Sequence, residues 1–304
     1  MSFHPHDATS SPFNVSTSYF REHYEVPLAA CAVYVLAIAV GHSVMKQRDP
    51  WRLKPQLAAW NFFLALFSLV GASQTAPVLL TKLFRRPLLE SICVPPSEDW
   101  GAGACGLWVQ IFVLSKFAEL ADTVFIVLRK RKLLFLHWYH HLTVLLYCWH
   151  AYATEAPHAL WFVSMNYCVH AIMYTYYALM AFNMGNLFIP PEFITAAQIS
   201  QMIVGVSVQC AAMRVARPCD IDGANLVFGA LMYLSYFFLF MKFALQRFVF
   251  KTNSRGTGLK DFAGHGDPPS LRTVFPLCSS IVDSLTTKMR KTLSFPTLAP
   301  PSSP

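Results

Sequence analysis

Seven apolar segments recur along the 304-residue chain, each near or above the roughly 18–20 residues that a helix needs to cross a bilayer. With 55% hydrophobic and 13% charged residues and a mean hydropathy of +0.40, the chain is too apolar for an ordinary soluble domain. We therefore predict an all-α polytopic membrane protein with seven transmembrane helices. They are centred on residues 27–45, 57–80, 106–128, 133–152, 158–183, 193–213 and 225–248.

Composition divides the chain into three regions. Residues 1–26 are polar and lack the basic segment and cleavage pattern of a removable signal peptide, so we expect a luminal N-terminal segment and a first span that inserts as its own signal. Residues 27–250 form the predicted membrane domain. Residues 251–304 are rich in Ser, Thr, Pro and Gly, which predicts a disordered cytosolic tail.

Lysine and arginine are concentrated in loops 46–54 and 129–132, and the excess of these residues in cytosolic loops sets the orientation of membrane proteins. With an odd number of spans, the N-terminus is then luminal and the C-terminus cytosolic. The basic residues between the second and third spans oppose the rule, because this loop lies on the predicted luminal side. Nearby carboxylates partly balance their charge. We attribute the net charge of +8 to orientation and to anionic headgroups or ligands, because no nucleic-acid motif is present.

Eight cysteines occur without CxxC spacing, which argues against a zinc or redox motif. Cys93, Cys105 and Cys219 are predicted to lie in luminal loops, where an oxidising compartment permits a disulfide. Cys93 with Cys219 is the pair we favour. On the same predicted side, Asn14 begins an Asn-Val-Ser sequence that could accept a glycan.

The third span carries Lys116, Glu119 and Asp122 at a spacing that predicts one shared helix face. A charge inside a span costs at least about 2.5 kcal/mol, so each one needs a partner, a cavity or a functional role. An intrahelical ion-pair network would explain these three residues alone.

The fourth span opens with His137, His140 and His141, whose spacing places three imidazoles on one face. Such a cluster suits metal ligation, or acid–base and nucleophilic chemistry, because imidazole titrates near neutrality. These histidines and the charges of the third span both lie toward the predicted cytosolic end.

Two further spans carry polar faces. The fifth presents Asn166, His170, Tyr174 and Tyr177, of which the tyrosines are also typical of simple packing. The sixth begins with Thr195, Gln198 and Gln201, for which interhelical hydrogen bonding is the simpler explanation. Together the four helices predict a reaction chamber inside a helical bundle, entered from the cytosol.

Four motifs, in this order, resemble those of the fatty acid elongases of the endoplasmic reticulum, the very-long-chain 3-oxoacyl-CoA synthase family. They are KFAELADT at 116–123, HWYHH at 137–141, HAIMYTYY at 170–177 and TAAQISQ at 195–201. The resemblance covers about residues 27–250. It implies a multi-pass protein of the endoplasmic reticulum membrane, with six of the seven helices arranged as an inverted barrel around a tunnel closed at the luminal end.

The resemblance also implies an acyltransferase of fatty acid biosynthesis that condenses a long-chain acyl-CoA with malonyl-CoA to 3-oxoacyl-CoA, CoA and carbon dioxide, with no metal or redox cofactor. The sequence around the histidines is similar to the subgroup acting on saturated and monounsaturated medium-to-long chains. Expected partners are membrane lipids and the ketoacyl-CoA reductase, dehydratase and enoyl reductase of the elongation cycle. The resemblance is also compatible with homo-oligomerisation.

By the same resemblance, His140 is the nucleophile that accepts the acyl group as an acyl-imidazole. We expect His141, His170, Asn166 and Gln198 to stabilise the developing oxyanion, and Glu119 and Asp122 to orient an imidazole, while Lys116 balances their charge or meets the malonyl carboxylate. Tyr174, Tyr177 and Gln201 would complete the substrate chamber. Candidate cations for the CoA phosphates, which could equally serve topology and lipid binding, are Arg129, Lys130, Arg131, Lys132, Lys242 and Arg247.

Other interpretations are open at this stage. A membrane di-iron desaturase or hydroxylase also uses clustered histidines, but it needs several histidine boxes, and this chain has one. A seven-helix receptor or transporter would explain the spans but needs no such cluster beside charged residues. For chain length, Cys210 and Arg214, near the luminal end of the sixth span, are our candidate determinants.

Overall fold

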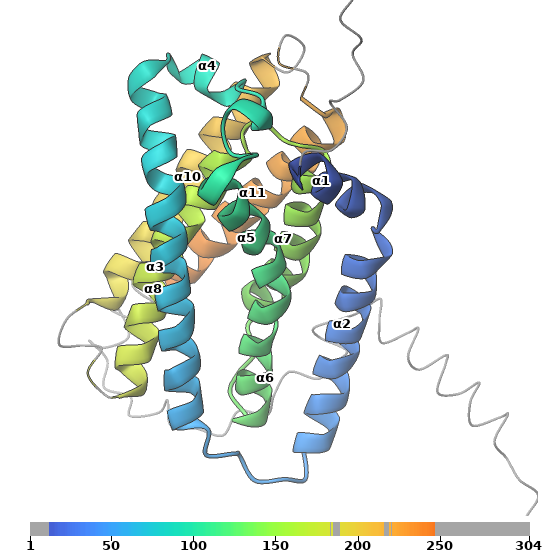
Figure 1. Ribbon diagram of the computed structural model, residues 1–304. Helices are drawn as coiled ribbons and strands as arrows, with labels where there is room; N and C mark the ends of the chain where they lie inside the picture. The colour runs from blue at the N-terminus through green and yellow to red at the C-terminus, as the bar shows by residue number, and fades with distance from the viewer. Residues whose placement is uncertain (1–11, 183, 185–188, 216–218, 220, 247–304) are drawn as a thin grey trace, which may run out of the picture. The chain divides into compact units, whose positions relative to one another are not determined.

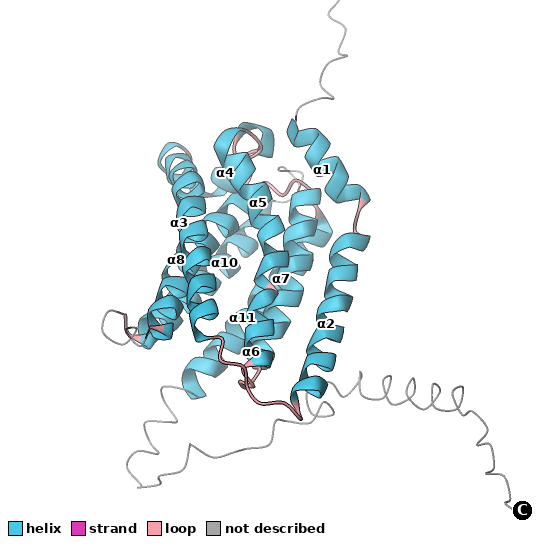
Figure 2. Ribbon diagram, turned by 60° about the horizontal axis from the view of Figure 1, so that its bottom comes forward, coloured by secondary structure: helices cyan, strands magenta, loops and turns pink. Residues whose placement is uncertain are grey.

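Helices form all the regular secondary structure in the computed structural model, which describes residues 12–182, 184, 189–215, 219 and 221–246; no strand occurs in these ranges (Figure 2). They belong to one compact unit. The elements are α1 (Pro12–Glu22), α2 (Glu25–Met45), α3 (Lys54–Arg85), α4 (Leu88–Ile92), the 3₁₀ helix η1 (Pro96–Glu98), α5 (Gly103–Glu119), α6 (Ala121–Leu128), α7 (Phe135–Ala153), α8 (Ala159–Ala181), α10 (Pro191–Val215) and α11 (Gly223–Ala244).

Four of these helices, α2, α3, α10 and α11, are long and apolar enough to cross a membrane. Their outward faces carry exposed large apolar side chains such as Leu36, Phe62, Ile203 and Leu231, as expected for surfaces that meet lipid. The prediction of an all-helical membrane protein is confirmed. The count of seven membrane-crossing helices stays a prediction.

The third predicted span contains a break at Leu120, between α5 and α6. The Leu120 N–H donates to the Phe117 carbonyl at 3.3 Å, and the Thr123 N–H donates to the Leu120 carbonyl at 3.2 Å. These three-residue separations are those of a 3₁₀ turn. The continuous face expected for Lys116, Glu119 and Asp122 is therefore interrupted, and Asp122 has different partners from the other two.

Packing between neighbouring helices closes a ring in the order α3, α8, α10, α11, α7 and α5, and α5 returns to α3. The contact between α3 and α8 is the most extensive. Gly71 permits it, because a Cβ at this position would lie 2.4 Å from the Tyr167 ring. Helix α2 lies outside the ring, against α6 and α7 (Figure 1).

One end of the ring, which we call the disulfide end, carries α1 and α4, while α6 ends at the other (Figure 1). A disulfide joins Cys93 and Cys219 here, the pair favoured from the sequence. Lys82 and Asp99 form a buried ion pair in the same region. Burial raises the pKa of the Asp99 carboxyl, and the Lys82 ammonium acts in the opposite direction.

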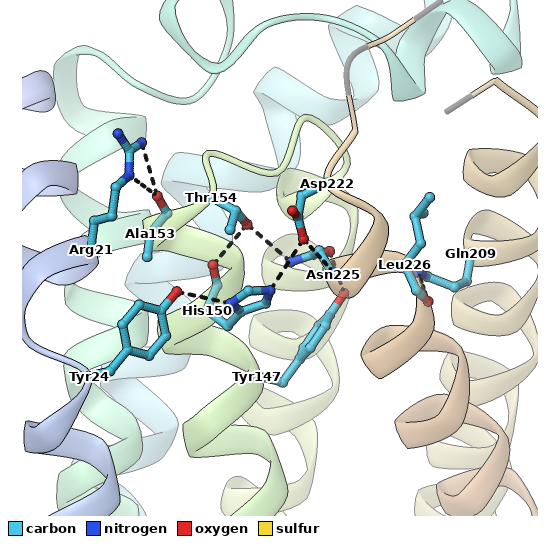
Figure 3. A network of polar contacts seen from close by, with 10 residues as sticks. All are labelled: Arg21, Tyr24, Tyr147, His150, Ala153, Thr154, Gln209, Asp222, Asn225 and Leu226. Atoms are coloured by element: carbon cyan, nitrogen blue, oxygen red, sulfur yellow. Dashed lines mark hydrogen bonds and ion pairs between the residues drawn. The ribbon is translucent and has the colours of Figure 1, made fainter. Parts of the chain in front are cut away.

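Polar contacts also join three helices at the disulfide end (Figure 3). The Tyr24 hydroxyl lies 2.9 Å from Nδ1 of His150, whose Nε2 lies 3.5 Å from Oδ1 of Asp222. The same Asp222 oxygen accepts a hydrogen bond from the Asn225 N–H at 2.7 Å and so caps α11. This network links the start of α2, the end of α7 and the start of α11.

Candidate active site

A cavity of about 570 Å³ lies among the helices, on the side of the structure where α7 begins and α8 ends. Apolar side chains form part of its wall, including Leu57, Phe125, Met173 and Phe240. Its polar lining combines residues from five helices and the 129–134 loop: Lys54, Asn61, Asp122, Arg129, Arg131, His137, His140, His141, Asn166, His170, Tyr174, Tyr177, Gln198 and Gln201. The structure thus gathers side chains from all four motifs around one space.

The three histidines of α7 all face this cavity. The ring of His141 lies 4.5 Å from that of His137 and 5.6 Å from that of His140, between centroids. His137 is oriented from outside its helix, because its Nε2 lies 3.0 Å from the Thr123 hydroxyl, which is 2.7 Å from the Tyr34 hydroxyl. Helix α2 therefore takes part in holding the histidine cluster.

His140 has its backbone carbonyl held by α11. The Tyr236 hydroxyl donates to this carbonyl at 3.2 Å and lies 2.6 Å from the Thr143 hydroxyl. The imidazole of His140 also lies 4.9 Å from the Tyr236 ring, between centroids. The first turns of α7 are thus fixed against α11 while the imidazole remains on the cavity wall.

Lys116 and Glu119 lie behind the cavity wall rather than on it. Lys116 Nζ donates to Glu119 Oε1 at 2.6 Å and to Asn166 Oδ1 at 3.4 Å, and all three side chains are buried. Because the amide oxygen of Asn166 faces this ammonium, its Nδ2 is directed to His170 Nε2, 3.2 Å away. An amide nitrogen only donates, so His170 Nε2 accepts and its Nδ1 carries the proton.

Asp122 is on the cavity wall and has partners on two other helices. Its Oδ1 accepts from Trp60 Nε1 at 2.6 Å, and its Oδ2 accepts from the Tyr174 hydroxyl at 2.9 Å. The Tyr174 ring in turn meets that of His170 edge-on, 5.3 Å between centroids. In the part of the chain that the structure describes, Asp122 makes no hydrogen bond to an imidazole. It holds Tyr174, whose ring packs against that of His170.

The glutamines of α10, Gln198 and Gln201, also line the cavity. Gln198 Nε2 contacts Met173 Sδ at 3.3 Å, and Gln201 is buried. Thr195, predicted beside them, is instead bonded to the Pro191 carbonyl of its own helix at 3.2 Å.

Only some of the predicted cations lie at the cavity. Arg129 and Arg131 line it, and so does Lys54, which the sequence analysis assigned to orientation alone. Lys130 is exposed and donates to the Lys46 carbonyl at 3.4 Å. Lys132 and Lys242 are exposed and are not among the lining residues, while Arg247 and the side chain of Asn14 lie outside what the structure describes.

The chain-length candidates are not placed as expected. Cys210 and Arg214 are exposed on α10, and neither is among the residues that line the histidine-containing cavity. Their position therefore does not support a role in setting chain length.

The sequence did not reveal Trp60, Tyr34 and Tyr236, whose hydrogen bonds hold other residues of the site in place. Each places one polar atom on a bulky side chain within an otherwise apolar span, so no helical periodicity marks it. The only signal was that a hydroxyl or indole N–H inside a membrane span requires a partner. Within the described ranges, no three His, Cys, Asp or Glu side chains are arranged to hold a metal ion.

Comparison with known proteins gives a consistent result. The ELO family, described as GNS1/SUR4, matches residues 19–256. "Very long chain fatty acid elongase 6" of Drosophila melanogaster is 43% identical over 228 residues, 72% of this chain and 71% of the relative. The Gallus gallus protein of the same name is 40% identical over 239 residues, 77% of this chain and 88% of the relative. "Very long chain fatty acid elongase 3" of Homo sapiens is 38% identical over 245 residues, 78% of this chain and 90% of the relative.

The fold and the site define a helical membrane protein with a histidine-lined chamber. Because the family match spans most of the chain and the relatives are aligned over most of their own length, the class can be stated more closely. The chain belongs to the ELO (GNS1/SUR4) family and is a fatty acid elongase, a condensing acyltransferase.

Proposed function

We propose that this elongase condenses a long-chain acyl-CoA with malonyl-CoA by way of an acyl group held on His140. The observation that carries the proposal is the position of His140 on the wall of a cavity that His141, Asn166, His170 and Gln198 also line. A nucleophile and hydrogen-bond donors that converge on one space are what acyl transfer requires.

In the first half-reaction, the imidazole nitrogen of His140 attacks the thioester carbonyl. The C–S bond breaks, the CoA thiolate takes up the proton that the imidazole loses, and a neutral acyl-imidazole remains. Donors on the cavity wall stabilise the oxyanion that forms on the carbonyl oxygen. His170 is suited to this role because Asn166 directs its N–H to Nδ1.

In the second half-reaction, the bond between the malonyl carboxylate and its methylene carbon breaks. Carbon dioxide leaves, the electron pair forms a thioester enolate, and this carbon attacks the acyl carbonyl. The acyl–imidazole bond then breaks, a proton from solvent restores the neutral imidazole of His140, and 3-oxoacyl-CoA is released. Holding the two acyl carbons together supplies much of the rate enhancement.

Substrate phosphates would be held where Lys54, Arg129 and Arg131 line the cavity. Guanidinium groups form paired hydrogen bonds with phosphate oxygens, and the ammonium adds a point charge. Lys130, Lys132, Lys242 and Arg247 remain candidates only for longer-range attraction of the anionic CoA, in the same way as they attract lipid headgroups.

For the whole protein, we propose seven membrane-crossing helices in the endoplasmic reticulum membrane, six of them forming an inverted barrel. The closed ring of helices supports the barrel. The disulfide supports a luminal position for the end that carries it, and the basic 129–132 loop supports a cytosolic position for the other. Residues 1–26 would then be luminal and 251–304 cytosolic. The ketoacyl-CoA reductase, dehydratase and enoyl reductase would process the product.

Intact-protein mass spectrometry after incubation with acyl-CoA alone tests the covalent step. We expect an acyl adduct and stoichiometric CoA release in the wild type and in His23→Ala, a matched histidine change outside the cavity, but neither in His140→Ala. An adduct that persists in His140→Ala would remove His140 from this role. Turnover of both substrates by a wild type that never forms an adduct would indicate direct condensation, with the histidines as bases.

A further inference from the structure

The turn that follows α6 has an unusual backbone conformation. Lys130 has a φ of 51°, in the left-handed region that glycine adopts freely and that a residue with a Cβ rarely adopts. The Lys130 N–H donates to the Val127 carbonyl at 3.0 Å, and the Arg131 N–H donates to the Ile126 carbonyl at 2.9 Å. These two hydrogen bonds define a Schellman motif, in which the left-handed position is usually glycine. Lysine therefore holds a conformation here that its own side chain disfavours.

The loop between α2 and α3 holds this turn from outside. The Trp51 N–H donates to the Leu128 carbonyl at 3.0 Å, and Lys130 Nζ donates to the Lys46 carbonyl at 3.4 Å. The first contact satisfies one of the carbonyl groups that the end of a helix leaves without a partner. It also connects the turn to the start of α3, where Lys54 lines the cavity of the three histidines.

The turn decides where the two neighbouring arginines lie. In a continuous α-helix, side chains two positions apart point about 200° apart, so Arg129 and Arg131 would lie on nearly opposite faces. Here both line the cavity, while the Lys130 side chain is directed to Lys46. Among the described residues, neither arginine takes part in an ion pair. Both guanidinium groups can therefore serve an anionic ligand.

We propose that the left-handed turn at Lys130 holds Arg129 and Arg131 together as a clamp for the phosphates of the CoA thioester. The inference rests on the proposed function, which brings a CoA substrate to this cavity. Guanidinium groups bind phosphate oxygens through paired hydrogen bonds, and two of them that converge on one space are pre-organised for a ligand with several phosphates. Lys130 is then a positioning residue, which acts through its backbone conformation and not through its charge.

Two substitutions at Lys130 separate conformation from charge. Lys130→Gly and Lys130→Val remove the same positive charge, but glycine accepts the left-handed conformation, whereas valine, branched at Cβ, resists it. Purified full-length variants are assayed with acyl-CoA and saturating radiolabelled malonyl-CoA. KM for acyl-CoA should be about fivefold higher in Lys130→Val than in Lys130→Gly, which corresponds to about 1 kcal/mol, and kcat should be equal in the two. Lys130→Asn should resemble Lys130→Gly, because asparagine also tolerates this conformation.

Matched controls separate this effect from general damage. Lys132 is also exposed and basic, but its φ is not positive, so Lys132→Val should have a KM no higher than that of Lys132→Gly. Acyl-pantetheine carries the acyl thioester without phosphates, and Lys130→Gly and Lys130→Val should use it equally well. If Lys130→Val does not elute as a folded protein in size-exclusion chromatography, Lys130→Ala replaces it. Its unbranched Cβ should still raise KM for acyl-CoA about twofold over Lys130→Gly.

The outcomes distinguish this inference from the proposed function. Equal KM values for acyl-CoA in Lys130→Gly and Lys130→Val would overturn the role of the turn and leave the condensation reaction intact. An equally large difference between these variants with acyl-pantetheine would assign the effect to general damage and would also overturn that role. A wild type that elongates no acyl-CoA would instead overturn the proposed function itself.

Discussion

Two histidines of the site take their orientation from groups on other helices. His137 is bonded to Thr123 of α6, which is bonded to Tyr34 of α2. His170 is held by Asn166, whose amide is turned by the Lys116 ammonium. An imidazole acts as acid, base or nucleophile through one particular nitrogen, and these contacts fix which nitrogen faces the cavity.

Replacing Tyr34 with Phe should slow turnover without weakening substrate binding. The variant removes only the hydroxyl that fixes Thr123, and a neutral hydrogen bond contributes about 1 kcal/mol, which corresponds to about a fivefold lower kcat. KM should stay unchanged, because Tyr34 is not among the cavity-lining residues. Tyr19→Phe is the exposed control. An equal loss in both variants, or a change confined to KM, would contradict a positioning role for Tyr34.

Variants of Lys116 and Glu119 should separate the effect of this ion pair on stability from its effect on turnover. Lys116→Met leaves the Glu119 carboxylate buried without its charged partner, which costs about 3–5 kcal/mol of unfolding free energy. Adding Glu119→Gln removes that charge and should restore most of the stability. The double variant should still turn over about fivefold more slowly, since nothing then directs the Asn166 amide and the His170 tautomer.

The buried ion pair at the disulfide end provides the control for this experiment. Lys82→Met should also destabilise the protein, and Lys82→Met with Asp99→Asn should recover, because the same desolvation argument applies. Here the double variant should keep the wild-type kcat. Thermal unfolding in detergent and steady-state kinetics measure the two quantities. Full recovery of kcat in the Lys116 and Glu119 double variant would rule out their effect on His170.

At the scale of elements, local sequence predicts where each helix lies better than how it is interrupted. All seven predicted spans contain a helix, because long apolar runs mark them unambiguously. The break at Leu120 could not be predicted, since residues 117–123 contain neither Pro nor Gly. It coincides with contacts from other helices, Trp60 and Tyr174 to Asp122 and Tyr34 to Thr123, and such tertiary contacts leave no local signal.

Motif spacing predicts which side chains share a helix face. Residues three or four apart on a helix share a face, so the histidines of α7 and the Asn166, His170 and Tyr174 series of α8 were correctly expected on one side. Lys116 and Glu119 are on the expected helix but are buried behind the cavity wall. Spacing identifies the face of a helix, but it cannot tell whether that face meets a cavity or a neighbouring side chain.

The start of α11 depends on Asp222, which serves two partners (Figure 3). It caps the helix through the Asn225 N–H and lies near His150. Asp222→Ala should lower the unfolding free energy by about 0.5–2 kcal/mol through loss of the cap. Asp222→Asn preserves the cap and should lose much less. If chemical unfolding shows that Asp222→Ala and Asp222→Asn lose similar amounts of unfolding free energy, the effect belongs to the His150 contact and not to the cap.

For the whole molecule, the disulfide connects two loops that the chain separates widely. Cys93 follows α4, Cys219 precedes α11, and the two are 126 positions apart in sequence. Cross-links across long segments stabilise by about 2–4 kcal/mol. The double variant Cys93→Ser/Cys219→Ser should therefore unfold at a lower temperature than the wild type. Cys168→Ser, which removes an exposed free thiol of α8, is the matched control and should leave Tm unchanged.

The same bond also tests the orientation of the molecule, because disulfides persist in the endoplasmic reticulum lumen and are reduced in the cytosol. Membranes isolated from expressing cells with an alkylating agent and no reductant should yield protein in which Cys93 and Cys219 resist modification until a reductant is added. Reduction should then lower Tm in the wild type but not in the double variant. Free thiols at both positions in freshly isolated membranes would place the disulfide end in a reducing compartment. The 129–132 loop and the entrance for CoA would then face the lumen, which would contradict the proposed topology.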